Sequence, residues 1–244
     1  MSERLRGVSF DWWGTLYVHR DARTRRLQVL RDTLQGQGCE RAREQVETAY
    51  DVAMKRMDVE WRSGRVYHPS AWLADLLAEL ELKLPQPACR HLQGEVEEAL
   101  LATPPILVAG AADLLAELRR AGARIGLISD TGLTVGRAMR RILEGDGILG
   151  YFDAFAFSDE VGVYKPDRLA FETVLGQLGL KPEEAVHVGD LPETDICGAK
   201  ALGLRAVLIT GVSHRQDDGQ ADAVVEGFAE LGRLFRRWGL LPDA

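Results

Sequence analysis

The chain has 244 residues, of which 46% are hydrophobic and 27% charged, and its formal net charge is −7. This length and hydrophobic content suffice for one large core, or for one core and a smaller second domain. The negative charge argues against nucleic acid as a partner, and no apolar run is long enough for a membrane span or a signal-peptide core.

The three cysteines, Cys39, Cys89 and Cys197, are widely separated in the sequence. Their odd number and spacing provide neither a disulfide framework nor a zinc site. Few cysteines and no secretory signal are typical of a reducing compartment, so we expect a cytoplasmic protein.

The first predicted element lies in the stretch Val8 to Leu16, which reads Val-Ser-Phe-Asp-Trp-Trp-Gly-Thr-Leu. A short apolar run that stops at a glycine predicts a buried strand whose end opens into a loop. Asp11 then stands at the carboxyl end of this strand, where open α/β sheets bind their ligands. Alone this is a weak signal, because Asp also commonly starts a turn.

The next eighty residues, 21–103, have helical periodicity and no convincing strand. Hydrophobic residues recur at helical spacing around Leu27 to Leu34 and again from Val46 to Met57. Pro69 and Pro85 precede two further helices, which the pattern predicts to run through Leu80 and Leu101. A helical block of this size after a single strand indicates an inserted helical bundle.

From residue 104 onward, strands and helices alternate. The predicted strands are 124–129, 152–157, 185–189, 205–209 and 223–225, and the predicted helices are 111–120, 135–143, 169–178, 195–202 and 228–237. This alternation predicts a parallel sheet with helices on both faces. We therefore expect an α/β fold with a Rossmann-like core from residues 1–20 and 104–244, and an all-helical cap from residues 21–103.

Polar residues gather where the predicted strands end. The first strand ends in Asp11, the second in Ser129 and Asp130, and the fourth in Gly189 and Asp190, with Asp195 five positions later; Lys165 precedes a helix. The carboxyl ends of parallel strands meet at one edge. Carboxylates gathered there repel one another unless a cation or protons neutralise part of their charge. Mg²⁺ is a cation that suits such a cluster. Lys165 and the Ser129 hydroxyl suit the oxygens of a phosphate that Asp11 attacks in line.

On these residues the chain resembles the haloacid dehalogenase-like hydrolase superfamily, in the branch with a helical cap inserted after the first motif. Four motifs match in order and span nearly the whole chain. They are Phe10-Asp11-Trp12-Trp13-Gly14-Thr15-Leu16, Leu127-Ile128-Ser129, Lys165-Pro166, and Gly189-Asp190 through Asp195-Ile196-Cys197-Gly198-Ala199.

The resemblance implies a role for each matching residue. Asp11 is expected to be the nucleophile and a ligand of Mg²⁺, Ser129 to hold the transferred group, and Lys165 to neutralise it. We also expect Asp130, next to Ser129, to bind substrate. Asp190 is expected to bind the metal, and Asp195 to be a further metal ligand or its orienting neighbour. The implied substrate is a small phosphorylated metabolite, cleaved through an aspartyl-phosphate intermediate.

Trp13 is a departure from the family's phosphatases, which carry a second Asp two residues after the nucleophile as the general acid. An indole offers only an N–H donor and no acid–base function near neutral pH. The backbone carbonyl at this position, which the family also uses for the metal, is independent of the side chain. The pattern therefore predicts a metal site without the usual proton donor.

Three functions stay open on these residues. The first is a Mg²⁺-dependent phosphohydrolase with weakened or substituted acid catalysis. The second is a hydrolase of C–halogen or C–P bonds, although dehalogenases of this kind lose the acids kept here as Asp190 and Asp195. The phosphonate enzymes need a cap lysine, for which Lys55 is the candidate in the second cap helix. The third is a non-catalytic binding protein that retains the pocket.

Overall fold

The computed structural model describes residues 4–243 and divides them into two units. The first unit contains the described residues up to His19, Pro105–Asp130 and those from Leu143 onward. The second contains Arg20–Pro104 and Thr131–Ile142. Among the helices of this described part, none is long and apolar enough to cross a membrane.

The first unit is built on a six-stranded, entirely parallel sheet in the order β3-β2-β1-β4-β5-β6. The strands are β1 (Gly7–Phe10), β2 (Arg124–Ser129), β3 (Ala154–Phe157), β4 (Ala185–Gly189), β5 (Arg205–Ile209) and β6 (Ala223–Val225). Strands β1 and β4 are central and entirely buried, which explains why they are largely apolar in sequence. The predicted α/β class is confirmed.

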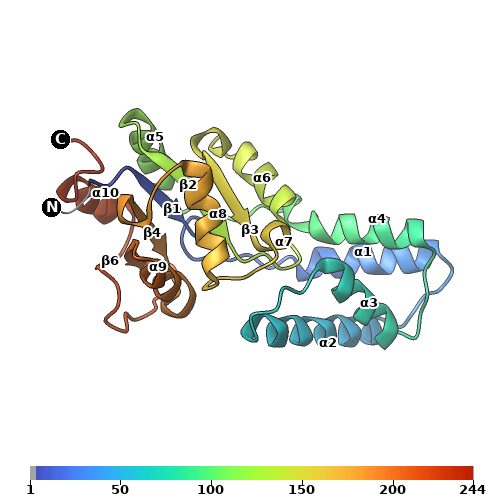
Figure 1. Ribbon diagram of the computed structural model, residues 1–244. Helices are drawn as coiled ribbons and strands as arrows, with labels where there is room; N and C mark the ends of the chain where they lie inside the picture. Colours follow the sequence, from blue (N-terminus) through green and yellow to red (C-terminus); the bar gives the residue numbers. More distant parts are fainter. Residues whose placement is uncertain (1–3, 244) are drawn as a thin grey trace. The chain divides into compact units, whose positions relative to one another are not determined.

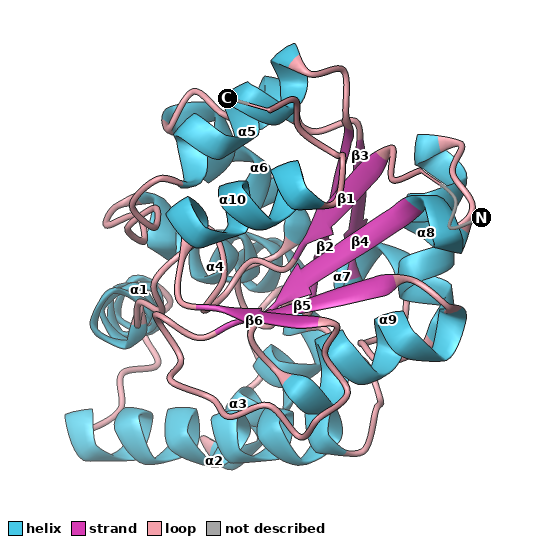
Figure 2. Ribbon diagram, turned by 90° about the vertical axis from the view of Figure 1, so that its left-hand side faces the viewer, coloured by secondary structure: helices cyan, strands magenta, loops and turns pink. Residues whose placement is uncertain are grey.

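Helices cover both faces of this sheet, as Figure 2 shows, with α5 and α10 on one face and α8 and α9 on the other. Their bounds are α5 (Ala111–Arg120), α7 (Ser158–Val161), α8 (Arg168–Leu178), α9 (Cys197–Leu202) and α10 (Phe228–Arg237), with 3₁₀ turns at Leu149–Tyr151 and Pro182–Glu184. Apolar side chains of α8 and α9 pack with residues of β2 to β5 in one buried cluster.

The second unit is helical, as the periodicity predicts. It contains α1 (Arg23–Gly36), α2 (Arg43–Arg62), α3 (Pro69–Glu79), α4 (Gln86–Glu97) and a 3₁₀ turn at Ala99–Leu101. In Figure 1, α1 lies beside α4 and α2 beside α3, and the four helices share one hydrophobic core. Helix α4 ends at Glu97, four residues before the predicted end at Leu101, because the chain continues in the 3₁₀ turn.

The structure departs from the expected division in one segment. Thr131–Ile142, which the sequence pattern assigns to the α/β core, clusters with the helical unit and includes most of α6 (Gly136–Gly145). Leu133 is 3% exposed and lies in the core of the helical unit. Arg137 pairs with Glu97 and Glu98 next to α4. Strand–helix alternation does not reveal this, because it cannot say against which unit a helix packs.

The two segments that lead to and from the helical unit pair with each other within the first unit. The Val18 N–H donates to the Ile106 carbonyl at 2.9 Å, and the Val108 N–H donates to the Leu16 carbonyl at 2.8 Å. A bridge between Tyr17 and Leu107 completes this short antiparallel ribbon. The ribbon holds the chain that leaves the first motif.

Candidate active site

Four of the predicted site residues meet at the carboxyl edge of the sheet, within the first unit. The Lys165 Nζ lies 2.5 Å from Asp11 Oδ1 and 2.7 Å from Asp195 Oδ1. Carboxylate oxygens of Asp11, Asp190 and Asp195 all lie within 4.8 Å of one another. All four side chains are buried.

Asp11 extends the pairing of the two central strands by one residue, because its N–H donates to the Val188 carbonyl at 2.9 Å. This bond fixes the nucleophile candidate at the end of β1. Its Oδ1 accepts from Lys165, whereas its Oδ2 is buried and has no hydrogen-bond partner among residues 4–243. A buried carboxylate oxygen without a partner is costly unless a ligand satisfies it.

Asp195 is held by a widened turn. Residues Pro192–Ile196 form a short π-helical segment before α9. The sequence pattern instead predicts a regular helix from Asp195. Irregularities of this type are common at functional sites. The Asp195 Oδ2 accepts from the Leu191 N–H at 3.0 Å, and its own N–H donates to the Leu191 carbonyl at 2.9 Å. A Cβ on Gly189 would lie 2.2 Å from the Asp195 Cγ, so only glycine lets this side chain lie over β4.

Gly14 makes room for Asp190 in a similar way. Its φ is +76°, a conformation that glycine adopts at little cost, and a Cβ there would lie 2.3 Å from the Asp190 Oδ2. The glycine of the first motif is therefore in direct van der Waals contact with the first acid of the fourth motif. This contact explains the glycine without any role in chemistry.

The cluster carries more negative than positive charge, with three carboxylates around one ammonium. Burial raises the pKa of Asp11, as do Asp195 and Asp190, and Lys165 offsets this only in part. Burial, followed by the charge of Asp195, raises the pKa of Asp190 to about 6. Burial also acts to raise the pKa of Asp195, but Lys165 and the hydrogen bond from His187 outweigh it and hold that pKa below its usual range.

A divalent cation fits these residues. Asp11 Oδ2 is an unsatisfied hard oxygen, Asp190 is a second carboxylate close to it, and the surplus negative charge needs a positive partner. The Trp13 carbonyl accepts no backbone hydrogen bond among the described residues, whereas the Trp12 carbonyl accepts from two N–H groups. Carboxylate and carbonyl oxygens are the ligands that Mg²⁺ prefers.

Ser129 is the last residue of β2, the neighbour of β1, and Asp130 follows it. The Ser129 hydroxyl is buried and has no hydrogen-bond partner in the described part of the chain. Asp130 Oδ1 accepts from the Lys165 backbone N–H at 2.9 Å, and Lys165 Nζ also donates to the Ile128 carbonyl at 3.3 Å. Asp130 thus holds the loop of Lys165, while Ser129 offers a free hydroxyl beside it.

Trp13 places an aromatic surface where the family's phosphatases carry an acid. Its half-buried indole stacks on the exposed His19 ring, with ring centroids 5.3 Å apart and an angle of 13° between the planes. Trp12, in contrast, is fully buried and stacks on Tyr17 at 4.3 Å. The two adjacent tryptophans therefore differ in role: one belongs to the core and the other to the surface near the nucleophile.

His187 and Ser9 are not among the site residues predicted from the sequence. In the structure, His187 Nδ1 lies 2.8 Å from Ser9 Oγ, and His187 Nε2 lies 3.0 Å from Asp195 Oδ1. The available signal is the period of two along each strand, which puts Ser9 on the face of Asp11 and His187 on the face of Gly189. The strand pairing that sets Ser9 opposite His187 is a tertiary feature.

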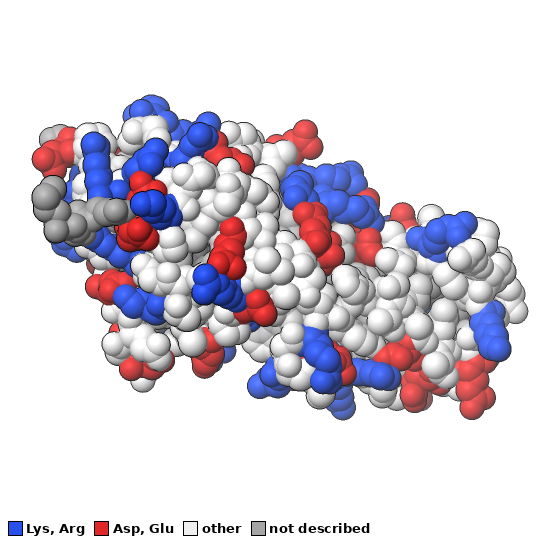
Figure 3. All heavy atoms as spheres, in the orientation of Figure 1, with Lys and Arg blue, Asp and Glu red and all other residues white. Residues whose placement is uncertain are grey.

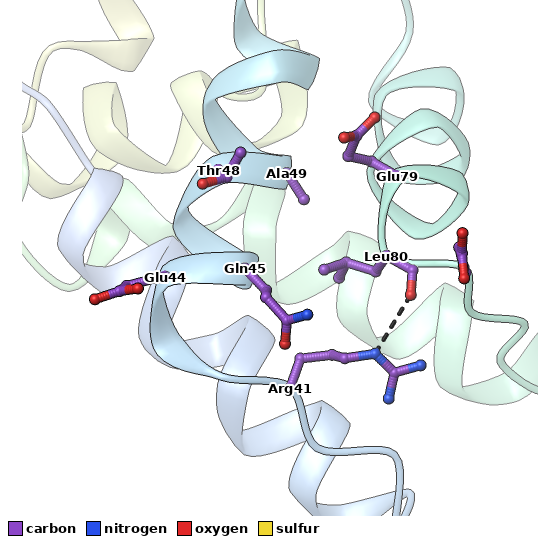
Figure 4. Close-up of a pocket in the computed structure, with 8 residues that line it drawn as sticks. Arg41, Glu44, Gln45, Thr48, Ala49, Glu79 and Leu80 are labelled. Atoms are coloured by element: carbon purple, nitrogen blue, oxygen red, sulfur yellow. Dashed lines mark hydrogen bonds between the residues drawn. The ribbon is translucent and has the colours of Figure 1, made fainter.

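A separate cavity of about 450 Å³ lies in the helical unit (Figure 4). It is lined by Arg41, three glutamates (Glu44, Glu79 and Glu81) and neighbouring residues of α2 and α3. The Arg41 guanidinium donates to the Leu80 carbonyl at 3.4 Å. None of the predicted site residues lines this cavity.

Several curated proteins with similar sequences are phosphatases by name. The chain is 40% identical over 95 residues to phosphoserine phosphatase of Thermus thermophilus, a match that covers 39% of this chain but only 37% of that protein. It is 30% identical over 165 residues to ribulose-1,5-bisphosphate 5-phosphatase of Halopiger xanaduensis, covering 64% of this chain and 68% of that protein.

A solved structure matches nearly the whole fold. The 2-haloacid dehalogenase from Pseudomonas syringae pv. Tomato DC3000 superimposes with a TM-score of 0.71 at 24% identity, over 96% of this chain and 99% of the other. At that identity the likeness concerns the fold alone. The sequence profile of the haloacid dehalogenase-like hydrolases matches residues 5–203, and the chain therefore belongs to this hydrolase family.

Proposed function

We propose that the protein is a Mg²⁺-dependent phosphohydrolase that cleaves a small phosphorylated metabolite through an aspartyl-phosphate on Asp11. One observation carries the proposal: a buried cluster of three carboxylates and Lys165, in which Asp11 Oδ2 has no hydrogen-bond partner among the described residues. The phosphatase names of the relatives support the same class of substrate.

In the proposed reaction, a carboxylate oxygen of Asp11 attacks phosphorus in line with the leaving group. The bond from phosphorus to the leaving oxygen breaks, and that oxygen departs as an anion, which takes a proton from solvent water where its basicity requires one. Lys165, already fixed beside Asp11, and the free Ser129 hydroxyl hold the phosphoryl oxygens. Water then attacks phosphorus, which releases phosphate and restores Asp11.

Asp11, Asp190 and the Trp13 carbonyl are the residues that we assign to the metal. When bound, Mg²⁺ neutralises negative charge on the phosphoryl oxygens. Of the two roles open for Asp195, the structure favours that of orienting neighbour. Both of its oxygens already accept hydrogen bonds, from Lys165, His187 and the Leu191 N–H.

The replacement of the usual acid by Trp13 bears on the substrate. A positioned general acid contributes about 10²- to 10⁴-fold to the rate, and the indole cannot supply it. We therefore propose that preferred substrates carry leaving groups that need no proton, such as aryl or acyl phosphates, and that activity on simple alkyl phosphates is weak.

The competing functions have less support. Asp190 and Asp195 are both present in the cluster, although metal-independent dehalogenation does not require them. Lys55 is exposed on α2, as expected of a solvated surface lysine rather than a buried Schiff-base lysine. A binding protein without turnover would retain the same cluster, so activity must separate it from the enzyme.

The test is a release assay with and without Mg²⁺, on aryl, acyl and alkyl phosphates and on 2-haloacids. We expect metal-dependent phosphate release that Asp11→Asn abolishes while the variant stays folded. Metal-independent release of halide would instead identify a dehalogenase. No release of either, together with Mg²⁺ and phosphate binding in calorimetry, would identify a binding protein.

A further inference from the structure

The inference concerns His187, a fully buried histidine that takes no part in the reaction proposed above. It lies in the middle of β4, and its ring meets the Phe171 ring of α8 edge-on, with centroids 5.1 Å apart. Both ring nitrogens have a polar neighbour. Each is within hydrogen-bond distance of one polar side chain, Ser9 on one side and Asp195 on the other.

These contacts belong to a continuous buried chain of polar groups that runs from β1 through β4 and back to the nucleophile. Ser9 contacts His187 at 2.8 Å, His187 contacts Asp195 at 3.0 Å, Asp195 contacts Lys165 at 2.7 Å, and Lys165 contacts Asp11 at 2.5 Å. All five residues are at most 6% exposed. Water therefore cannot replace a missing member of the chain easily.

The chemistry of the neighbours determines the proton positions on His187. Asp195 is an ionised carboxylate bound to an ammonium, so it can only accept, and the His187 Nε2 must carry a hydrogen. Burial beside the Lys165 ammonium disfavours a second charge and lowers the pKa of His187. The Nδ1 is then a bare acceptor, and the Ser9 hydroxyl must donate to it.

We propose that His187 is a positioning residue for the nucleophile, held by Ser9 in its Nε2–H tautomer so that it fixes the Asp195 carboxylate against Lys165. The Asp195 Oδ1 accepts from both Lys165 and His187. The Leu191 N–H holds the other oxygen, Oδ2, so without His187 the carboxylate loses one of the two neutral donors that set its rotation, and Lys165 loses a firmly oriented partner. The effect of His187 on turnover rests on the proposed function, whereas the tautomer of His187 does not depend on it.

The first test is ¹⁵N NMR of the imidazole in the intact, metal-free protein. We expect a neutral His187 with hydrogen on Nε2 throughout the range of about pH 5 to 8, in which exposed histidines titrate. Hydrogen on Nδ1, or a histidinium that titrates in this range, would overturn the proposal. This result does not depend on whether the protein turns over any phosphate ester.

The second test compares variants in turnover of an aryl phosphate at saturating Mg²⁺. We expect His187→Leu to lower kcat about 10- to 100-fold, as the loss of outer partners typically does, with KM nearly unchanged. Ser9→Ala should have a smaller effect in the same direction. His187→Gln keeps a donor near the Nε2 position and should recover most of the loss.

Val186→Ala is the matched control, because it loosens the same strand on the opposite face. A purely structural role predicts that His187→Leu and Val186→Ala lower the melting temperature alike and leave kcat unchanged in the folded protein; that outcome would overturn the proposal. If the wild type shows no turnover, the proposed function fails. Binding of inorganic phosphate with Mg²⁺ then replaces kcat, and we expect His187→Leu to bind about 10-fold more weakly.

Discussion

At the scale of single residues, Asp190 is the acid whose position most directly tests the metal assignment. It is 3% exposed and lies against Gly14. We expect Asp190→Asn to weaken Mg²⁺ binding by about tenfold or more, equivalent to at least 1.4 kcal/mol, because an amide supplies no charge. Calorimetric titration of both proteins measures the change, and equal affinities would remove Asp190 from the site.

The same residue predicts a pH dependence in the absence of metal. The pKa of Asp190 is raised to about 6, so the folded protein holds this proton more tightly than the unfolded chain does. The stability linked to it is present below the ordinary carboxyl pKa of about 4 and is lost as the pH rises through about 6.

The comparison of wild type with Asp190→Asn isolates this effect, since Asn resembles the protonated acid. In urea unfolding without metal, we expect the variant to become the more stable protein above about pH 6, by roughly 1–3 kcal/mol. Below about pH 4 the two stabilities should converge. A constant difference over this range would mean that Asp190 is not perturbed.

Trp13 is the residue that separates this chain from the family's phosphatases. We expect Trp13→Asp to raise turnover of an alkyl phosphate selectively, because an acid there adds up to about 10²- to 10⁴-fold. Trp13→Asn is the control, since it removes the same indole without adding an acid. The melting temperature of each variant is measured together with its kinetics, because loss of the aromatic contact to His19 lowers stability.

A different result would place the acid elsewhere. If the wild type already cleaves alkyl phosphates at an ordinary enzymatic rate with a bell-shaped pH profile, another residue donates the proton. In that case Trp13→Asp should give no selective gain, and the preference for aryl and acyl phosphates would be abandoned.

At the scale of elements, Arg26 joins three segments of the helical unit. It is only 7% exposed, and its guanidinium donates from Nε to the Val96 carbonyl at 3.1 Å and from Nη2 to the Thr134 hydroxyl at 2.8 Å. Helix α1 is thereby tied to the end of α4 and to the segment that follows Ser129 and Asp130. The bonds help to explain why that segment belongs with the helical unit.

We expect Arg26→Leu to lower the free energy of unfolding by about 1–3 kcal/mol, because it removes two hydrogen bonds of a buried charged group, to the Val96 carbonyl and the Thr134 hydroxyl. Denaturant unfolding measures the loss. Arg25→Ala is the control, because Arg25 is exposed and its pair with Glu95 spans 3.7 Å, so its removal should cost at most about 1 kcal/mol. Similar losses in both variants would show that Arg26 is not a structural tie.

At the scale of the whole molecule, charge and sheet edges bear on association. Acidic and basic side chains lie close together over much of the face in Figure 3, and the net charge is −7. Strand β3 forms one edge of the sheet. There the Gln177 amide accepts from the Phe155 N–H at 3.0 Å and donates to the Phe155 carbonyl at 3.2 Å, which occupies groups that another strand would use.

We expect Gln177→Ala to increase self-association, because it frees the backbone groups of Phe155 at this edge. Sedimentation velocity over a range of concentrations measures the effect. The control, Gln28→Ala, removes an exposed amide from α1 and should leave the distribution unchanged. An unchanged distribution for Gln177→Ala as well would show that the amide does not protect the edge.

The sequence alone determined the fold class, because the period of two or 3.6 residues in apolar positions reflects local backbone geometry. It also identified Asp11, Lys165, Asp190 and Asp195 as neighbours, since parallel strands must end at one edge. What it could not determine depends on packing between distant segments. Strand order sets Ser9 opposite His187, and the buried contacts of Leu133 and Arg26 assign residues 131–142 to the helical unit. Such contacts leave no local pattern in the sequence, and only the tertiary structure decides them.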